Sequence, residues 1–348
     1  MLLIFIEKLY LCRPNPHSRP VKVKDIKIGK FVNSRNMVAV AGILMLLAAR
    51  IAFSRDEITY LTVDRGILFA SPNVWIHDAW LTMVVNTALL LGTALMWMTV
   101  IQIFNPFRAL TTLPASFFLM MMLAVPDLTD QLTTGSLLAA IMPICLALLW
   151  SAFSDENRLR HIFLLFTVIS ALAMTQYCFA VYLPVFIIGC VQMKIFSPRT
   201  VIACILGIVT PWWIVLGLGI ASFDELHLPD MTGVFSALDT DDIVNLLLVA
   251  ITTSIITIIA WFANIMKVIS LNVNLRAFNG NIAFIGLFTI IAMCADYTNT
   301  TAYLPTLMMV ASYQLSVLFG AANDNRNSGI ALAVMGLYGV FYVIRIFV

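Results

Sequence analysis

Long apolar runs follow one another from Met37 to Val348, and charged residues stand almost entirely between them. A transmembrane helix needs about 20 mostly apolar residues to cross a hydrocarbon layer of about 30 Å. Eleven runs come near this length: residues 37–53, 79–103, 110–126, 132–153, 161–176, 178–196, 199–221, 243–263, 282–297, 301–320 and 330–348. The pattern therefore predicts an all-α, polytopic membrane protein with about eleven transmembrane helices.

The stretch 161–196 is too long for one ordinary span and short for two, and the sequence leaves both readings open. Polar residues interrupt its middle at 175–177, and basic residues flank it at 158–160 and at 194–199. Flanking basic residues favour the same side of the membrane. We therefore expect a hairpin of two short helices, with regular helix interrupted between about Thr175 and Pro184.

Prolines mark further helix boundaries and bends. A Leu-Pro step opens the apolar residues at 113–114, 183–184 and 304–305, and proline suits the first turn of a helix, where an N–H has no partner. These three steps predict helix starts. Pro143 and Pro211 lie inside apolar runs and predict kinks.

Composition agrees with a membrane protein and adds an orientation. Hydrophobic residues make up 61% of the chain, charged residues 11%, and the net charge is +2, which indicates no nucleic-acid partner. If the N-terminus is cytoplasmic and each run changes the side, 16 of the 20 Lys and Arg residues fall inside, as the positive-inside rule requires. The N-terminus is then inside, residues 104–109, 154–160 and 321–329 are cytoplasmic, and Val348 lies outside.

This distribution also divides the chain in two. We expect residues 1–36 to form a basic cytoplasmic segment and residues 37–348 to form the transmembrane domain. Translation from Met37 is an alternative that would leave the transmembrane domain alone. No cleavable signal peptide is evident, because the basic residues follow the short apolar stretch at the N-terminus.

The sequence lacks the motifs that mark common families of soluble enzymes. The chain has no phosphate loop, dinucleotide glycine pattern or nucleophile elbow, and its four histidines are dispersed. The six cysteines form no C-x-x-C pair, so no disulfide or metal framework is visible. The spans hold almost no ionisable residues, whereas ion-coupled transporters usually place charges near mid-membrane, which disfavours that class.

One acidic motif suggests an activity. Asp56 and Glu57 follow the first run by two or three residues, on the predicted outer face. This resembles the membrane glycosyltransferases of the GT-C class, which carry an Asp or Asp-Glu at the start of the first outer loop and take sugar from a polyprenyl-phosphate donor. The resemblance implies that Asp56 and Glu57 are catalytic, since a carboxylate near the interface can act as base on an acceptor hydroxyl.

The same resemblance implies substrate-binding groups near this pair. Basic side chains there would hold the donor phosphate through charge-assisted hydrogen bonds. The basic candidates are Arg50, Arg55, Arg65 and His77. The other substrate-binding candidates are Tyr60, Asp78 and Asp127. No cofactor is required, although a divalent cation near Asp56 and Glu57 is compatible with the motif.

The chain also resembles a family of polytopic inner-membrane proteins of Bacteroidota-type bacteria. This resemblance rests on the Phe104–Arg108 turn, the Leu-Pro openings and the Thr210–Trp213 segment, and it implies no activity. It implies a multi-pass protein of the bacterial inner membrane. Two functions follow from the sequence as hypotheses: a GT-C-like transferase, or an inactive relative, working on a lipid-linked sugar in the bilayer, and a non-catalytic envelope-biogenesis scaffold or transport component.

Overall fold

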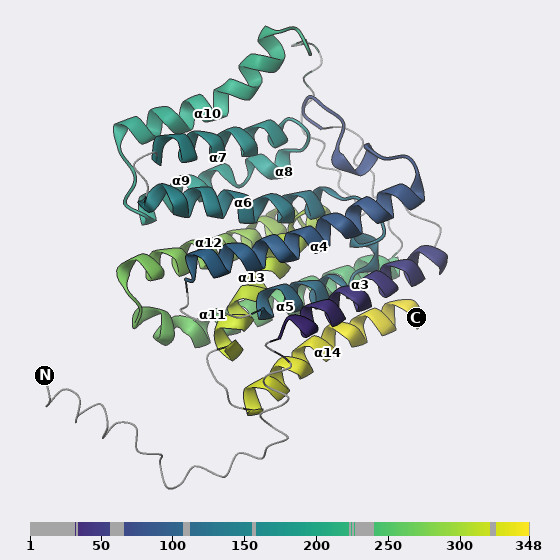
Figure 1. Ribbon diagram of the computed structural model, residues 1–348. Helices are drawn as coiled ribbons and strands as arrows, with labels where there is room; N and C mark the ends of the chain where they lie inside the picture. The colour runs from purple at the N-terminus through teal and green to yellow at the C-terminus, as the bar shows by residue number, and fades with distance from the viewer. Residues whose placement is uncertain are drawn as a thin grey trace, which may run out of the picture.

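The computed structural model describes residues 32, 34–55, 66–106, 112–154, 158–222, 224, 226, 240–320 and 325–347. Within these ranges the protein is entirely helical and contains no strand (Figure 1). The helices lie side by side, with α10 at the upper edge of the view and α14 at the lower edge.

Eight of the described helices are long and apolar enough to cross a membrane. They are α3 (Arg35–Arg55), α4 (Ala79–Phe104), α6 (Thr134–Ser154), α10 (Pro198–Gly217), α11 (Thr240–Ile269), α12 (Val273–Ala295), α13 (Thr300–Gly320) and α14 (Asn325–Phe347). Shorter helices are α5 (Leu113–Met122), α7 (Arg158–Ala173), α8 (Tyr177–Ala180) and α9 (Leu183–Gln192). Single 3-10 turns are η1 (Pro72–Val74), η2 (Pro126–Leu128) and η5 (Tyr297–Asn299).

The predicted all-helical membrane class is therefore confirmed, while the number of crossings stays a prediction. Helix α5 has 10 residues, all of them buried. At 1.5 Å per residue it is about 15 Å long, half of the hydrocarbon layer. A short helix of this kind persists because neighbouring helices, rather than lipid, cover its ends.

The predicted hairpin in 161–196 is confirmed in its shape. Helix α7 ends at Ala173, and α8 and α9 follow after turns. The Met174 carbonyl, which closes α7, accepts hydrogen bonds from the backbone N–H groups of Leu68 (2.9 Å) and Phe69 (3.1 Å). Gly66 lies against the same turn, and a Cβ there would stand 1.9 Å from the Thr175 carbonyl oxygen. The segment that begins at residue 66 thus covers the turn and satisfies its exposed backbone.

Two of the three Leu-Pro steps begin a helix, and the third prediction is wrong. Leu113 begins α5 and Leu183 begins α9, but α13 begins at Thr300, so Pro305 lies inside it. Pro305 has no N–H to offer the carbonyl four residues back, which belongs to Thr301. Pro143 and Pro211 lie inside continuous helices, and a bend at either one stays a prediction.

Helix α12 begins at Val273, nine residues before the apolar run that predicted it, and α11 extends to Ile269. The apolar run begins later than the helix because residues 272–281 contain four asparagines. One of them, Asn279, is buried, donates from Nδ2 to the carbonyls of Pro106 (2.8 Å) and Leu275 (2.7 Å), and accepts from the Tyr313 hydroxyl. Hydrogen bonding offsets the cost of burying the amide, so a polar helical turn fits the interior.

Helix α13 forms the centre of the bundle. Nearly all of its residues are buried, and it packs against α5, α6, α11 and α12. In contrast, α10 and α14 expose most of their apolar surface, as a lipid-facing helix does. One helix is therefore enclosed by protein, while the outer ones present their side chains to the bilayer.

Candidate functional site

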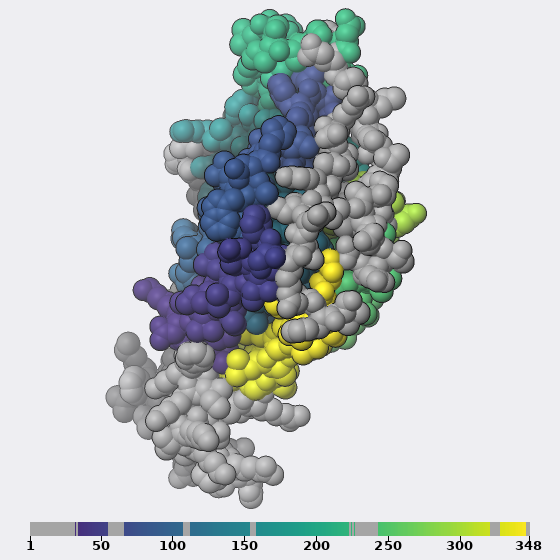
Figure 2. Space-filling model, turned by 90° about the vertical axis from the view of Figure 1, so that its right-hand side faces the viewer, coloured from purple at the N-terminus to yellow at the C-terminus, as the bar shows by residue number. Residues whose placement is uncertain are grey.

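The described loops that carry His77, Asp78 and Asp127 meet at one end of the bundle. Asn73 Oδ1 accepts from the Thr134 N–H at 2.9 Å, and Asn86 Nδ2 donates to the Leu128 carbonyl at 2.8 Å. The Thr82 hydroxyl accepts from the Leu132 N–H at 2.9 Å. We call this region, residues 66–78, 126–134, 174–177 and 296–300, the loop end; it faces the viewer in Figure 2.

Other segments that connect helices lie at the opposite end of the bundle. The Thr112 hydroxyl donates to the Ser34 carbonyl at 3.1 Å, and the Asn279–Pro106 hydrogen bond lies at this end as well. These contacts pair the start of α5 with the start of α3 and the first turns of α12 with the end of α4, while the number and order of the membrane crossings stay predictions. Which end faces the cytoplasm stays a prediction.

A reporter fusion tests this orientation. Alkaline phosphatase, which folds only outside the cytoplasm, is expected to be active when fused after Val348 and inactive when fused after Ser154, because the basic residues concentrate on the Ser154 side. A fluorescent protein that matures only inside should show the reverse. Active phosphatase after Ser154 would invert the predicted topology.

Arg50 lies near the end of α3 and contacts the first turn of α4. Its guanidinium carbon is 5.7 Å from the Phe53 ring centroid and 5.5 Å from that of Trp80. The two rings meet edge to face at 5.7 Å. Arg50 and Trp80 are exposed, in keeping with the positions that Arg and Trp take at a membrane interface.

Two predicted acidic ligands have structural partners. Asp78 is the N-cap of α4 and accepts from the Leu81 N–H at 2.9 Å; His77 precedes it in the same loop. Asp127, in η2, lies 3.7 Å from the Arg345 guanidinium of α14, with both side chains about a quarter exposed or less. The structure thus uses Asp78 to cap the start of α4 and Asp127 to tie α14 to the loop end.

The proposed catalytic pair falls outside the described residues. This applies to Asp56, Glu57, Tyr60 and Arg65, and to the side chain of Arg55, whose backbone is the last residue of α3. The structure describes the residues that precede the pair. Helix α3 stays helical up to Arg55, and Arg50 packs on α4 about one and a half turns before the end of α3.

Sequence reasoning missed a polar cluster around Asp296, between α12 and η5. Asp296 Oδ2 accepts from the hydroxyls of Tyr177 (2.5 Å) and Tyr303 (3.2 Å). Oδ1 accepts from Asn299 Nδ2 (2.9 Å) and the Thr298 hydroxyl (3.4 Å), and Asn299 also donates to the Tyr177 oxygen (2.6 Å). The available signal was the polar run 296–301 directly after an apolar span.

These bonds define what Asp296 can do. Four donors converge on one partly buried carboxylate and join α8, η5 and α13. With four donors on its two oxygens, the Asp296 carboxylate has few acceptor positions left for a ligand. We interpret the Asp296 cluster as a structural clamp.

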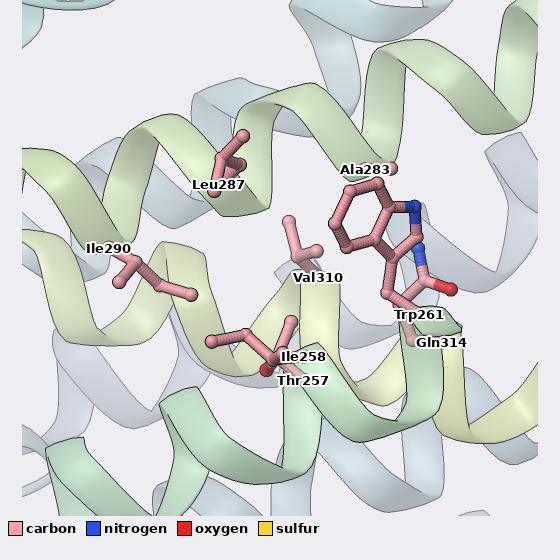
Figure 3. Close-up of a pocket in the computed structure, with 8 residues that line it drawn as sticks. All are labelled: Thr257, Ile258, Trp261, Ala283, Leu287, Ile290, Val310 and Gln314. Atoms are coloured by element: carbon pink, nitrogen blue, oxygen red, sulfur yellow. The ribbon is translucent and has the colours of Figure 1, made fainter. Parts of the chain in front are cut away.

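A small, mostly apolar crevice lies between α11, α12 and α13 (Figure 3). Thr257 and Gln314 contribute its polar groups, and Trp261 and Leu287 lie among its apolar ones. Its volume of about 10 Å³ is close to the minimum for a single water molecule. The crevice is therefore too small for a sugar or a lipid chain.

Among the described residues, no three His, Cys, Asp or Glu side chains are grouped as metal ligands. Comparison with family models, with curated proteins and with solved structures found no match. The fold and its apolar helices define the class: this chain is a multi-pass α-helical membrane protein.

Proposed function

We propose that this protein is a GT-C-like transferase that moves a sugar from a polyprenyl-phosphate donor at the loop end, with Asp56 and Glu57 supplying the base. The observation that carries the proposal is the fate of the other acids. Asp78, Asp127 and Asp296 each hold a structural partner at this end. The sequence places further acids on this side at Asp64, Asp130 and within residues 224–242, but Asp56 and Glu57 are the pair that directly follows α3, the position at which the GT-C resemblance expects the catalytic acids.

In this reaction, a carboxylate of the pair removes the proton of an acceptor hydroxyl. The hydroxyl oxygen then forms a bond to the anomeric carbon of the sugar, and the bond from that carbon to the phosphate oxygen breaks. Polyprenyl phosphate leaves with the bonding electrons, and the basic candidates of the first outer loop, Arg55, Arg65 and His77, would hold it through charge-assisted hydrogen bonds. The donor's prenyl chain would stay in the bilayer.

Paired substitutions test this function. Asp56→Asn and Glu57→Gln together are expected to lower transfer of a lipid-linked sugar at least about 100-fold, since a general base contributes roughly 10²–10⁴ in rate. Asp224→Asn removes the same charge from an exposed position before α11 and should leave transfer unchanged. Thermal unfolding of each variant shows whether the loss is chemical.

The second candidate function is a non-catalytic envelope-biogenesis scaffold or transport component. It is favoured by the way polar groups of the loop end bond to one another, as in the Asn73–Thr134, Asp127–Arg345 and Asp296 contacts. If the folded variant with both Asp56→Asn and Glu57→Gln kept wild-type function, the transferase proposal would be rejected and the scaffold or transport function would remain.

A further inference from the structure

An apolar groove runs between α3 and α4, which pack together in the bundle (Figure 1). Its volume is about 330 Å³, and its lining includes Ala39, Gly42, Leu46, Leu91, Leu95 and Leu119. We call it the α3–α4 groove. Leu119 comes from the buried helix α5 and forms the floor. Because Gly42 has no side chain, the groove stays open at this point; an added Cβ would lie 3.2 Å from the Leu91 Cδ2 atom.

The groove points toward Arg50. Gly42 meets Leu91 and Phe53 meets Trp80, so the two helices run antiparallel in one continuous register. Along α3, Leu46 and Arg50 are one turn apart on neighbouring positions of the same face, about 6 Å at 1.5 Å per residue. Leu46 is the last α3 residue that lines the groove, and one turn beyond it, toward the loop end, the Arg50 guanidinium lies over the Phe53–Trp80 ring pair.

We propose that the α3–α4 groove binds one acyl chain of an anionic phospholipid, with the lipid phosphate at Arg50. An apolar groove in the hydrocarbon layer excludes water and takes hydrocarbon. From Ala39 to Arg50 the site is about 17 Å long, close to the half-thickness of about 15 Å that one leaflet offers an acyl chain. A polyprenyl chain is several times longer than this.

Charge decides between a lipid and a second copy of the chain. Cation–π contacts with the Phe53 and Trp80 rings hold the exposed guanidinium beside α4, and its N–H groups can donate to a phosphate. A helix docked across the same face would have to cover this cation with apolar side chains, which is costly. The site does not depend on the transferase activity.

Native mass spectrometry of the full-length protein in detergent tests the proposal, with phosphatidylglycerol and phosphatidylcholine of identical chains as probes. The wild type should bind phosphatidylglycerol more tightly, and Arg50→Gln should lower that affinity about tenfold or more while leaving phosphatidylcholine unchanged. Arg276→Gln, which removes a charge at the opposite end, is the matched control. Arg50→Lys keeps the charge and should retain most of the preference for phosphatidylglycerol.

A second pair of variants tests the chain site independently of Arg50. Ala39→Trp fills the groove and should weaken binding of both lipids, whereas Gly92→Trp, at a position with open space around it, should not. Equal lipid binding by Ala39→Trp and the wild type would overturn the proposal. So would a polyprenyl phosphate that binds more tightly than phosphatidylglycerol and loses this affinity in Ala39→Trp, or a wild-type dimer that Ala39→Trp converts to a monomer.

Discussion

Gly135→Ala is expected to destabilise the protein by about 2–3 kcal/mol, the upper part of the range for overpacking a buried contact. Gly135 is the second residue of α6, and a Cβ there would lie 2.3 Å from the Thr301 carbonyl oxygen and 3.0 Å from the Pro305 ring. The obstacle is the backbone of α13, the enclosed helix, so no side-chain rotation can relieve it. Gly135→Val should cost more and lower the yield of folded protein.

The free energy of unfolding in mixed micelles, titrated with a denaturing detergent, measures this effect. Gly336→Ala is the control: Gly336 lies on α14 with no atom within 4 Å of its added Cβ, so the substitution should be neutral or slightly stabilising. If Gly135→Ala were as well tolerated as Gly336→Ala, α6 and α13 would not be in the close contact described above.

Asp296→Ala is expected to cost about 2–4 kcal/mol, because it leaves the donors of Tyr177, Tyr303 and Asn299 without their shared acceptor. Tyr303 is almost fully buried, so its hydroxyl cannot turn to water. The turn between α7 and α8 and the start of α13 should loosen together. Limited proteolysis or hydrogen exchange at residues 174–177 would report this opening.

Two further variants separate the clamp from a general effect of charge. Asp296→Asn keeps one acceptor oxygen and should cost less than Asp296→Ala. Asp224→Ala removes a carboxylate at an exposed position and should change the free energy of unfolding by less than about 0.5 kcal/mol. If Asp296→Ala were as stable as Asp224→Ala, the Asp296 cluster would not stabilise the fold.

The boundaries of the helices show where a hydropathy pattern is sufficient. Runs such as 79–103 and 132–153 agree with α4 and α6 within a residue or two. The pattern failed at the start of α12, where hydrogen bonds from Asn279 let polar residues stay helical inside the bundle. At Pro305 the Leu-Pro step failed and not the hydropathy pattern, because the apolar run 301–320 agrees with α13, which starts at Thr300 directly after a 3-10 turn.

The candidate site divides in the same way. The sequence placed Asp56 and Glu57 after the first span, and α3 does end at Arg55 immediately before them. It also listed Asp78 and Asp127 as ligands, yet a helix cap and an ion pair engage them. These partners are 3 residues away in one case and more than 200 in the other, and the distant partner cannot be read from local spacing.

The sequence by itself determined that this chain is a multi-pass helical membrane protein, because apolar run length and charge spacing respond directly to the thickness and polarity of a bilayer. Only the tertiary contacts show which helix is enclosed and which carboxylates serve as clamps. They also show the apolar groove between α3 and α4, on the side of α3 that leads toward Arg50. Those features depend on contacts between residues far apart in the chain. Packing and hydrogen bonding, rather than hydropathy, select such contacts.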